Sequence, residues 1–323
     1  MTLSIGIVGT GWFANEHAAR LAKFDDVSVR AFCGTSWEKA ERIAGRYSGA
    51  RGYGSLVRML DDNRLDAVYL CVPPYAHGEL EFELVERGIP FLIEKPLGAD
   101  LEIPTRVLQA VEAKGLLTSA AYHFRYMQGV QQAKALLEGR KIGMALGYWT
   151  GDMPGVSWWR RMNQSGGQFV EQTTHIVDLL RYLAGEVTEV YANYAQRVMY
   201  EKESDVSVPD VGTVAMKLAS GAVANIANTC ILPASHLTGL HLYTDQGVLE
   251  LSHSGLKDIR ADRTTEYFNR TDPYESESRA FLHAVLTGDA SGILSTYADA
   301  WLTQQVTVAA NRSAAEGQPV TIA

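Results

Sequence analysis

Cysteine is scarce in the 323-residue chain, and Cys33, Cys71 and Cys230 lie far apart in apolar stretches. Neither a disulfide framework nor a zinc site has such a spacing, so we expect buried thiols in a reducing compartment, the cytoplasm. Four histidines of the C-terminal half also lack a metal-ligand spacing: His236, His241, His253 and His283. We therefore predict no metal site.

An excess of basic residues is absent as well. The chain has 29 Lys and Arg against 37 Asp and Glu, a formal net charge of −8, and no basic block offsets it. Because nucleic acids and anionic membrane surfaces attract positive charge, we expect neither as a partner. No apolar run approaches the roughly 20 residues of a membrane-spanning helix. A predicted strand follows Met1 without a basic leader segment, which again favours the cytoplasm.

The residues that are present are typical of a globular protein, and the length suggests two domains. Hydrophobic residues make up 46% of the chain and charged residues 20%, enough to build sizeable cores. In the first third, strand patterns alternate with helical patterns, which predicts a doubly wound parallel sheet over residues 1–121. The expected strands are 3–8, 27–33, 67–72, 91–93 and 116–121.

After residue 121 the pattern changes, and residues 122–323 are expected to form a second α/β domain with an open, largely antiparallel sheet. A helix at 128–138 should precede a strand at 145–150. Further strands are expected at 187–194, 211–218, 222–231, 240–244 and 247–251. The polar segments 200–210 and 262–275 are expected to be loops, and helices are expected at 276–286 and 295–315.

A glycine-rich turn directly follows the first predicted strand and opens a helix. It consists of Gly9, Thr10, Gly11, Trp12, Phe13 and Ala14 and fits the pattern G-x-G-x-x-(G/A). The first glycine permits a tight turn, the second lets the backbone approach a pyrophosphate, and the small third residue allows helix–strand packing. The pattern therefore predicts a dinucleotide site, although a plain glycine turn that binds nothing would look similar.

The end of the second strand bears on the choice of cofactor. An NAD site calls for an acidic residue there, which binds the ribose 2′-hydroxyl, but this chain has Gly34, followed by Thr35 and Ser36. Without a carboxylate a 2′-phosphate is not repelled, and Thr35, Ser36 and Lys39 could bind one. The pattern thus favours NADP weakly over NAD, and an inward-turned Glu38 would restore NAD.

The stretch 165–185 is predicted to contain one helix, with Ser165, Gly166 and Gly167 before it as start signals and Gly185 closing it. With about 100° per residue, Glu171, His175, Asp178 and Tyr182 fall on one side, and apolar residues fall on the other. The simplest interpretation is an ordinary amphipathic surface helix. The other interpretation is one wall of a catalytic pocket.

A Glu94-Lys95-Pro96 triplet stands at the carboxyl end of another predicted parallel strand. Ligands of doubly wound sheets bind at that edge, so Lys95 is a candidate for contact with a ligand. A surface ion pair between Glu94 and Lys95 would explain the two charges but not their position.

In sequence order, five motifs resemble the Gfo/Idh/MocA family of NAD(P)-dependent oxidoreductases, and the resemblance covers essentially the whole chain. The motifs are Gly9-x-Gly11-x-x-Ala14, Cys71-Val72-Pro73-Pro74-x-x-His77, Glu94-Lys95-Pro96, the segment from Gly166 through His175 to Asp178, and Glu277-x-x-Ala280-Phe281-x-x-Ala284-Val285-x-x-Gly288.

The resemblance implies a Rossmann domain followed by an α/β domain whose open sheet commonly forms a homodimer or homotetramer face. It implies hydride exchange between nicotinamide and a secondary alcohol or ketone of a sugar, cyclitol or related polyol. By resemblance, Lys95 hydrogen-bonds the reacting oxygen, His175 is the general acid/base, and Asp178 holds substrate or histidine. The residues expected to border the cofactor after the fourth and fifth strands are Val72, Pro73, Pro74, His77, Glu94 and Lys95. The peptide bond between Lys95 and Pro96 is often cis in relatives.

The chain departs from the family within the segment that carries His175. Gln168 replaces the third glycine, Glu171 replaces an aspartate, and Thr173 replaces the last glycine. Glu171 keeps the charge but is one methylene longer. A catalytic role for Glu171, as the residue that orients His175 or Lys95, is therefore an open question.

Candidate substrate contacts lie near the start of the second domain. Aromatic faces stack on sugar C–H surfaces and arginines bind hydroxyl or carboxylate groups, which selects His123, Arg125, Trp158 and Arg160 besides His175 and Asp178. The tryptophans could instead pack the joint between the domains, and His77 could simply satisfy a turn.

Two other functions are compatible with the same motifs. A tightly held NAD could serve transient oxidation during glycoside cleavage, or the protein could be a dinucleotide-sensing regulator without catalysis. The presence of both Lys95 and His175 counts against the regulator.

Overall fold

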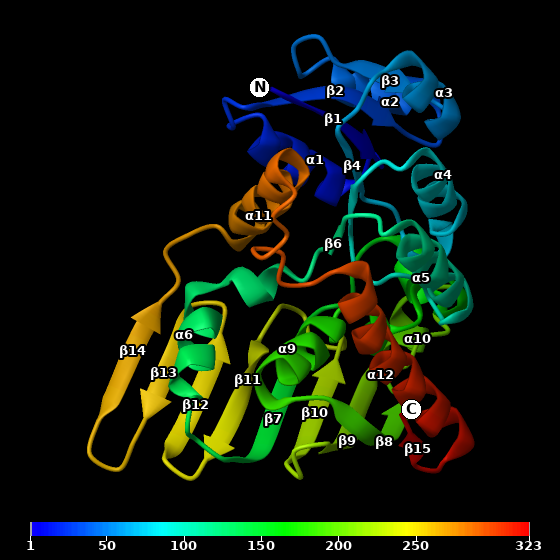
Figure 1. The fold of residues 1–323 in the computed structure, drawn as a ribbon. Coiled ribbons are helices and arrows are strands. Elements are labelled where there is room, and N and C mark those ends of the chain that lie inside the picture. Colours follow the sequence, from blue (N-terminus) through cyan, green and yellow to red (C-terminus); the bar gives the residue numbers. More distant parts are fainter. Residues whose placement is uncertain (1, 323) are drawn as a thin grey trace. The chain divides into compact units, whose positions relative to one another are not determined.

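A six-stranded parallel sheet organises the first compact unit of the computed structural model, which describes residues 2–322. The order is β3-β2-β1-β4-β5-β6, and the bounds are β1 (Leu3–Val8), β2 (Val27–Cys33), β3 (Arg51–Tyr53), β4 (Ala67–Leu70), β5 (Phe91–Ile93) and β6 (Thr118–Ala120). This confirms the predicted doubly wound Rossmann sheet (Figure 1). The short strand β3 was not expected, and it lies next to α2, where a side chain on Gly52 would collide with the backbone of Glu41.

Helices cover both faces of this sheet, as its nearly unbroken apolar strands require. The bounds are α1 (Trp12–Leu21), α2 (Trp37–Ala44), α3 (Leu56–Asp62), α4 (Glu79–Arg87), α5 (Glu102–Lys114) and α11 (Pro273–Thr287). One apolar cluster joins the sheet to α1, α2 and α11, and a second joins it to α3, α4 and α5. Figure 1 shows α1 and α11 side by side.

The first unit takes in a late segment of the chain as well as residues near the N-terminus. It comprises Met1–Leu97, Glu102–Tyr122 and Asp272–Trp301. The structure therefore differs from a single division after residue 121, because α11 packs on the parallel sheet. Phe281 is completely buried there, and its ring lies 5.8 Å from that of Tyr69.

The second unit contains a nine-stranded mixed sheet of order β14-β13-β12-β11-β7-β10-β9-β8-β15. The bounds are β7 (Ile142–Thr150), β8 (Val187–Ala195), β9 (Val211–Leu218), β10 (Val223–Thr229), β11 (Leu237–Thr244), β12 (Gly247–Ser252), β13 (Gly255–Ile259), β14 (Thr264–Phe268) and β15 (Val320–Thr321). Only β7 and β10 pair in parallel, so the prediction of an open, largely antiparallel sheet is confirmed.

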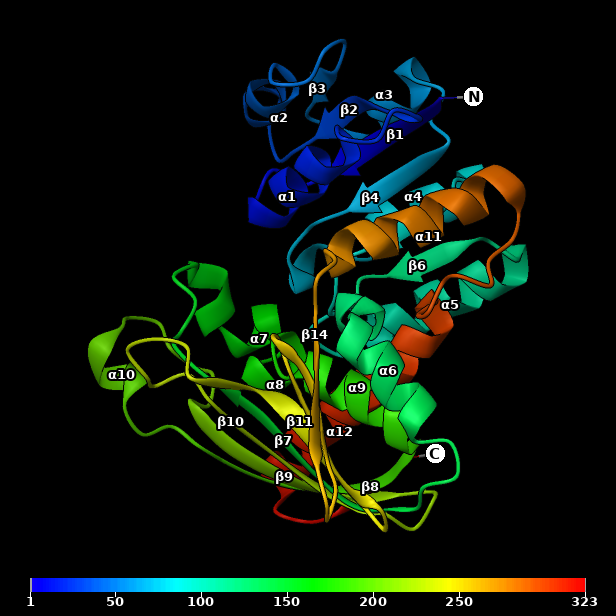
Figure 2. The ribbon, with the colours of Figure 1, turned by 90° about the vertical axis from the view of Figure 1, so that its left-hand side faces the viewer.

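One face of this sheet carries the core of the unit. The helices are α6 (Gln128–Leu136), α9 (Thr174–Ala184) and α12 (Tyr297–Glu316), whose residues from Leu302 on belong to this unit. Figures 1 and 2 show α6, α9 and the later part of α12 on the same face. Along β9, buried and exposed residues alternate, as in a strand with one face toward a core.

Two sequence-based predictions for this unit were wrong. The helix expected after Gly167 is not continuous, because a break at residues 172–173 separates α8 (Gln168–Glu171) from α9. Gly166 and Gly167, with left-handed φ angles of +75° and +83°, separate α8 from the short α7 (Met162–Ser165) before it. Residues 262–275 are not a loop throughout, since β14 lies within them. In the segment 200–210, α10 (Met199–Lys202) forms a single turn.

A buried charge cluster links the loop after α6 to β13. The guanidinium of Arg140 donates two hydrogen bonds, of 2.9 and 3.1 Å, to the Asp258 carboxylate, and the side chains are only 2% and 4% exposed. Arg260 donates a third, of 3.0 Å. The hydrogen bond from Arg140 is the main reason why the pKa of Asp258 lies below its ordinary value.

Replacing Arg140 with Met should lower the free energy of unfolding by at least about 2 kcal/mol, because a buried carboxylate loses its principal partner. Urea unfolding at neutral pH measures this. The matched control is Lys257→Gln on β13, the strand of Asp258. It removes an exposed ion pair with Glu266 of the neighbouring strand β14 and should cost less than about 0.5 kcal/mol.

The pair of Arg140 and Asp258 should also make the free energy of unfolding depend on pH. A carboxyl with a depressed pKa stabilises the fold above its unfolded pKa of about 3.9 and loses that contribution as the pH falls through its folded pKa. The stability difference between wild type and Arg140→Met should thus be constant near neutrality and shrink below about pH 4. An equal loss in the Lys257 control would contradict this account.

Candidate functional site

The glycine-rich turn between β1 and α1 has the geometry of a phosphate loop. Gly9 has a φ of +123°, and a Cβ there would lie 2.2 Å from the carbonyl oxygen of Cys71 at the end of β4. Gly11 is the N-cap of α1, no side chain caps the helix, and a Cβ on Gly11 would meet no atom within 4 Å. The backbone at Gly11 therefore has free space beside it, and no side chain caps the N–H groups of the first turn of α1, which fits a pyrophosphate.

The remaining residues of the turn also take suitable positions. Ala14 is fully buried against the sheet, as the small third residue of the pattern should be. Trp12 is 64% exposed at the first position of α1, and Phe13 is half-buried. Thr10 packs so closely on Gly34 that a Cβ on Gly34 would lie 2.6 Å from it. The loops after β1 and β2 are therefore neighbours.

Hydroxyl and ammonium groups follow Gly34 at the start of α2. Lys39 Nζ donates to Thr35 Oγ1 at 3.2 Å, and the Ser36 hydroxyl accepts from the backbone N–H of Lys39. Glu38 is exposed in the first turn of α2. The structure thus brings together the three residues that the sequence selected for a 2′-phosphate.

The loop after β4 contains Val72 and Pro73, followed by the short 3₁₀ helix η1 (Pro74–Ala76). The side chain of His77 is buried, and its Nδ1 pairs with the buried carboxylate of Glu81 on α4. Glu81 also accepts a hydrogen bond from the backbone N–H of Gly78. His77 therefore contributes to the local turn structure, as one of the sequence interpretations proposed.

The Glu94-Lys95-Pro96 corner follows β5 and is buried. Glu94 accepts a hydrogen bond from His17 Nε2 at 2.8 Å, and its backbone N–H donates to the carbonyl of Leu70. Lys95 is 8% exposed, and its Nζ lies 5.9 Å from the ring centroid of Phe13. The Lys95–Pro96 peptide is cis. An exposed ion pair between Glu94 and Lys95 is not what the structure shows.

In the second unit, His175 lies in the first turn of α9 and is buried among aromatic rings. The Phe124 ring stacks on it with centroids 4.6 Å apart, the His123 ring meets it edge-on at 4.9 Å, and the Trp149 ring lies 5.8 Å away. His175 is only 3% exposed. These rings fix the plane of the imidazole.

One turn further along α9, Asp178 is fully buried and paired with Arg125. Arg125 donates from Nε and Nη2 to the two carboxylate oxygens at 2.8 and 2.6 Å. Thr303 of α12 donates to the same carboxylate at 3.1 Å and accepts from Arg181 at 2.6 Å. The two substrate candidates Arg125 and Asp178 are thus brought together as a bidentate pair.

Glu171 does not share a helix with His175. It ends α8, and Trp159 Nε1 donates to its carboxylate at 2.7 Å. Trp159 packs in a cluster with Met199, Val208 and Cys230 of the same unit, with Trp158 at its edge. Arg160 forms an ion pair of 2.7 Å with Glu203.

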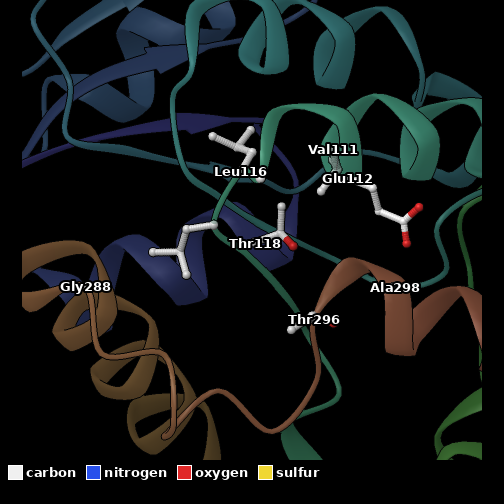
Figure 3. A pocket seen from close by; sticks show the side chains of 9 residues that line it. Val111, Glu112, Leu116, Thr118, Gly288, Thr296 and Ala298 are labelled. Atoms are coloured by element: carbon white, nitrogen blue, oxygen red, sulfur yellow. The ribbon is translucent and has the colours of Figure 1, made fainter.

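Two open hollows in the described residues lie away from the candidate side chains. One, of about 430 Å³, lies at the end of α5 in the first unit, and Figure 3 shows Glu112, Leu116, Thr118 and Thr296 among the residues that line it. The other, also about 430 Å³, lies on the second unit's sheet near Tyr194 and Asn228. Neither is lined by Lys95 or His175.

Within residues 2–322, no cluster of three or more His, Cys, Asp or Glu side chains is arranged to hold a metal ion. No helix in that range combines the length and apolar character that crossing a bilayer requires.

Sequence reasoning missed His17 and Phe124. His17 is the polar residue on an otherwise apolar face of α1 formed by Ala14, Ala18 and Leu21. A histidine on such a face could have indicated a buried polar contact. Phe124 stands between His123 and Arg125, but nothing in the sequence indicated that it would stack on His175.

The parallel sheet, the loop at Gly9 to Ala14 and the uncapped N-terminus of α1 define a dinucleotide-binding protein of the Rossmann type. Residues 3–122 match the family model described as "Oxidoreductase family, NAD-binding Rossmann fold", and residues 130–250 match the "GFO/IDH/MocA C-terminal domain". The chain belongs to the Gfo/Idh/MocA family of oxidoreductases, and it is an enzyme of that class.

Individual relatives are distant. Myo-inositol 2-dehydrogenase of Thermotoga maritima is 24% identical over 90% of this chain and 90% of its own length. The scyllo-inositol 2-dehydrogenase (NAD(+)) of Bacillus subtilis is 25% identical over 87% of this chain and 85% of its own. A solved levoglucosan dehydrogenase in complex with NADH superposes with a TM-score of 0.89 at 20% identity, with full coverage of both chains, and shares the fold.

Substitutions of the two glycines of the phosphate loop should have different effects on stability and on dinucleotide binding. Gly11→Ala should lower thermal stability only slightly, because its Cβ meets nothing and the cost is that of a poorer N-cap. It should weaken dinucleotide binding about tenfold or more, or about 1.4 kcal/mol, if the pyrophosphate approaches this backbone. Gly9→Ala should unfold or strongly destabilise the protein. Calorimetric titration with NAD and NADP, beside a thermal melt, separates these effects. Wild-type affinity in folded Gly11→Ala would exclude this loop as the phosphate site.

Proposed function

We propose that the protein transfers a hydride between a nicotinamide dinucleotide and a secondary alcohol or ketone of a sugar, cyclitol or related polyol. The observation that supports this best is the environment of His175, a buried imidazole held by the rings of Phe124, His123 and Trp149. The relatives named inositol and levoglucosan dehydrogenases support the substrate class.

In this proposal the bound dinucleotide supplies the redox step, and the chain supplies orientation and proton transfer. His175 takes the hydroxyl proton in oxidation and returns it in reduction, which suits an imidazole near neutral pH. The ammonium of Lys95 hydrogen-bonds the reacting oxygen and stabilises its alkoxide character. The uncapped turn at Gly11 would receive the pyrophosphate.

The pair of Arg125 and Asp178 has a second task in the proposal. Because both carboxylate oxygens of Asp178 accept from Arg125, and Thr303 adds a third bond, this carboxylate serves to hold α9 and so His175. Arg125, His123 and Trp158 remain proposed substrate contacts. Trp159 similarly restrains Glu171, whose role we propose is to orient catalytic groups.

For the cofactor, the Rossmann unit binds NAD or NADP, and we propose a weak preference for NADP. The contact between Lys39 and Thr35 and the absence of an acidic residue at Gly34 support it. An ammonium and two hydroxyls at this point could bind a 2′-phosphate.

We also propose that the parallel-sheet unit, expected from the sequence at residues 1–121, binds the dinucleotide and that the second unit, expected at residues 122–323, binds the substrate. We propose further that the protein is a cytoplasmic homodimer or homotetramer. Large apolar side chains support self-association, because Met144, Tyr191, Val223 and Leu237 are exposed on one face of the second unit's sheet.

A panel of sugars, cyclitols and keto-sugars, followed at about 340 nm with NAD(H) and NADP(H), tests the activity. Turnover should appear with at least one polyol, and Lys95→Met and His175→Ala should each nearly abolish it while leaving dinucleotide affinity within about twofold. Retained turnover in both variants would overturn the assignment of roles. Substrate conversion without net NADH would indicate the glycosidase chemistry instead.

The cofactor preference has its own test. Lys39→Gln should raise KM for NADP about tenfold and change KM for NAD by less than about twofold, because only NADP carries the phosphate. Arg42→Gln, on the same helix, is the matched control for loss of one positive charge. Equal effects on both cofactors would exclude Lys39 as a phosphate ligand.

A further inference from the structure

A single helix contacts both charged residues of the Glu94-Lys95-Pro96 corner. On α1, Phe13 places its ring 5.9 Å from Lys95 Nζ, and His17 lies 2.8 Å from the Glu94 carboxylate. The two residues are four positions apart and so lie one above the other on the same side of the helix. The N-terminal turn of this helix is the one that presents its N–H groups at Gly11.

The contact between His17 and Glu94 is buried and specific. His17 is 1% exposed and Glu94 is 4% exposed. An ionised carboxylate can only accept, so the Nε2–H of His17 donates to it. A carboxylate removed from water needs such a donor, and an apolar residue at position 17 could not provide one.

The groups around the pair are tyrosine rings and a thiol. The ring of Tyr69 from β4 lies 5.3 Å from that of His17, and the ring of Tyr274 from α11 lies 6.2 Å from it. Burial, followed by the charge of Glu94, raises the pKa of Cys71 and of Tyr274. The charged neighbours of these tyrosines include Glu277, which acts on both, and Arg20, which lies over the Tyr274 ring. The hydrogen bond that the structure gives to the Glu94 carboxylate comes from His17.

We propose that His17 is a positioning residue for Lys95. By its hydrogen bond to the Glu94 carboxylate, His17 attaches the backbone next to Lys95 to α1, the helix whose N-terminus forms the phosphate loop. Phe13 of the same helix contacts the Lys95 side chain itself. One rigid element thereby sets the place of the dinucleotide phosphates and of the lysine. The effect on turnover rests on the proposed function; the effect on Lys95 itself does not.

The position of Lys95 can be measured without turnover. Wild type and variants are treated briefly with acetic anhydride, and the acetylated fraction at Lys95 is determined by mass spectrometry relative to the exposed Lys257. The variants are His17→Leu, which cannot donate, and His17→Gln, whose amide can. The control is Tyr69→Phe, which removes a buried hydroxyl beside His17 but leaves its bond to Glu94.

We expect acetylation of Lys95 to rise several-fold in His17→Leu and to stay near the wild-type level in His17→Gln and Tyr69→Phe. Should His17→Leu not fold, His17→Met, with its more adaptable side chain, takes its place. Unchanged labelling in the folded variant overturns the proposal, as does an equal rise in Tyr69→Phe, which would indicate general loosening of the core.

The kinetic measurement uses a substrate found in the panel. In His17→Leu, kcat should fall at least about tenfold, since small displacements of a catalytic group are costly, while KM for the dinucleotide changes by less than about twofold. His17→Gln should recover most of the loss. If the wild type shows no turnover, the proposed function is refuted. The acetylation of Lys95 then still tests whether His17 positions Lys95. Normal kcat in His17→Leu would refute the role of His17 alone.

Discussion

The passage of Gly9 over the carbonyl of Cys71 is the contact on which the first unit depends. At this point β1 and β4 end side by side, and a side chain of any size on Gly9 would collide with the backbone. The N–H of Gly9 is bonded to the carbonyl of Cys33, so the ends of three strands are brought together. The start of α1 is thereby fixed, and with it the directions of Phe13 and His17.

The second unit depends on a buried hydrogen-bond network around one carboxylate. The Asp178 carboxylate is fully buried, and it is stable there because Arg125 donates two hydrogen bonds to it and Thr303 a third. Arg125 precedes the first strand of the unit, and Thr303 lies near the chain's end. Removing either would leave a buried charge only partly satisfied, so this network also explains why α9 keeps one orientation beneath the sheet.

Much of the fold could be predicted because strong local patterns determine it. The strands β1, β2 and β5 have the predicted bounds, since continuous apolar runs between helical patterns have few other interpretations. The polar edge strand β14 could not be predicted, because its inner face is only half-buried, with Tyr267 against the core, and its residues show no apolar alternation.

In the candidate site, too, local motifs could be predicted and tertiary contacts could not. The phosphate loop and the Glu94-Lys95-Pro96 corner could be recognised from short motifs with local geometry. The partners of these residues could not, because His17 and Glu94, or Trp159 and Glu171, meet only through tertiary structure. The segment around Gln168 was misjudged for that reason: its amide bonds to Asn228 and to the carbonyl of Thr229, sixty residues away, and these contacts hold α8 as a separate turn.

The packing of α11 on the parallel sheet determines which fragments of this chain could be expressed alone or exchanged with those of a relative. A fragment ending near residue 122 would contain every strand of the parallel sheet, but it would lack Phe281 and the ion pairs of Arg20 with Asp272 and of Asp26 with Arg279. The face of its sheet that packs against α1 and α2 would then lose its third helix. An exchange of the second unit between relatives would therefore need to keep residues 272–301 with the parallel-sheet unit, although these residues follow most of the second unit in the sequence.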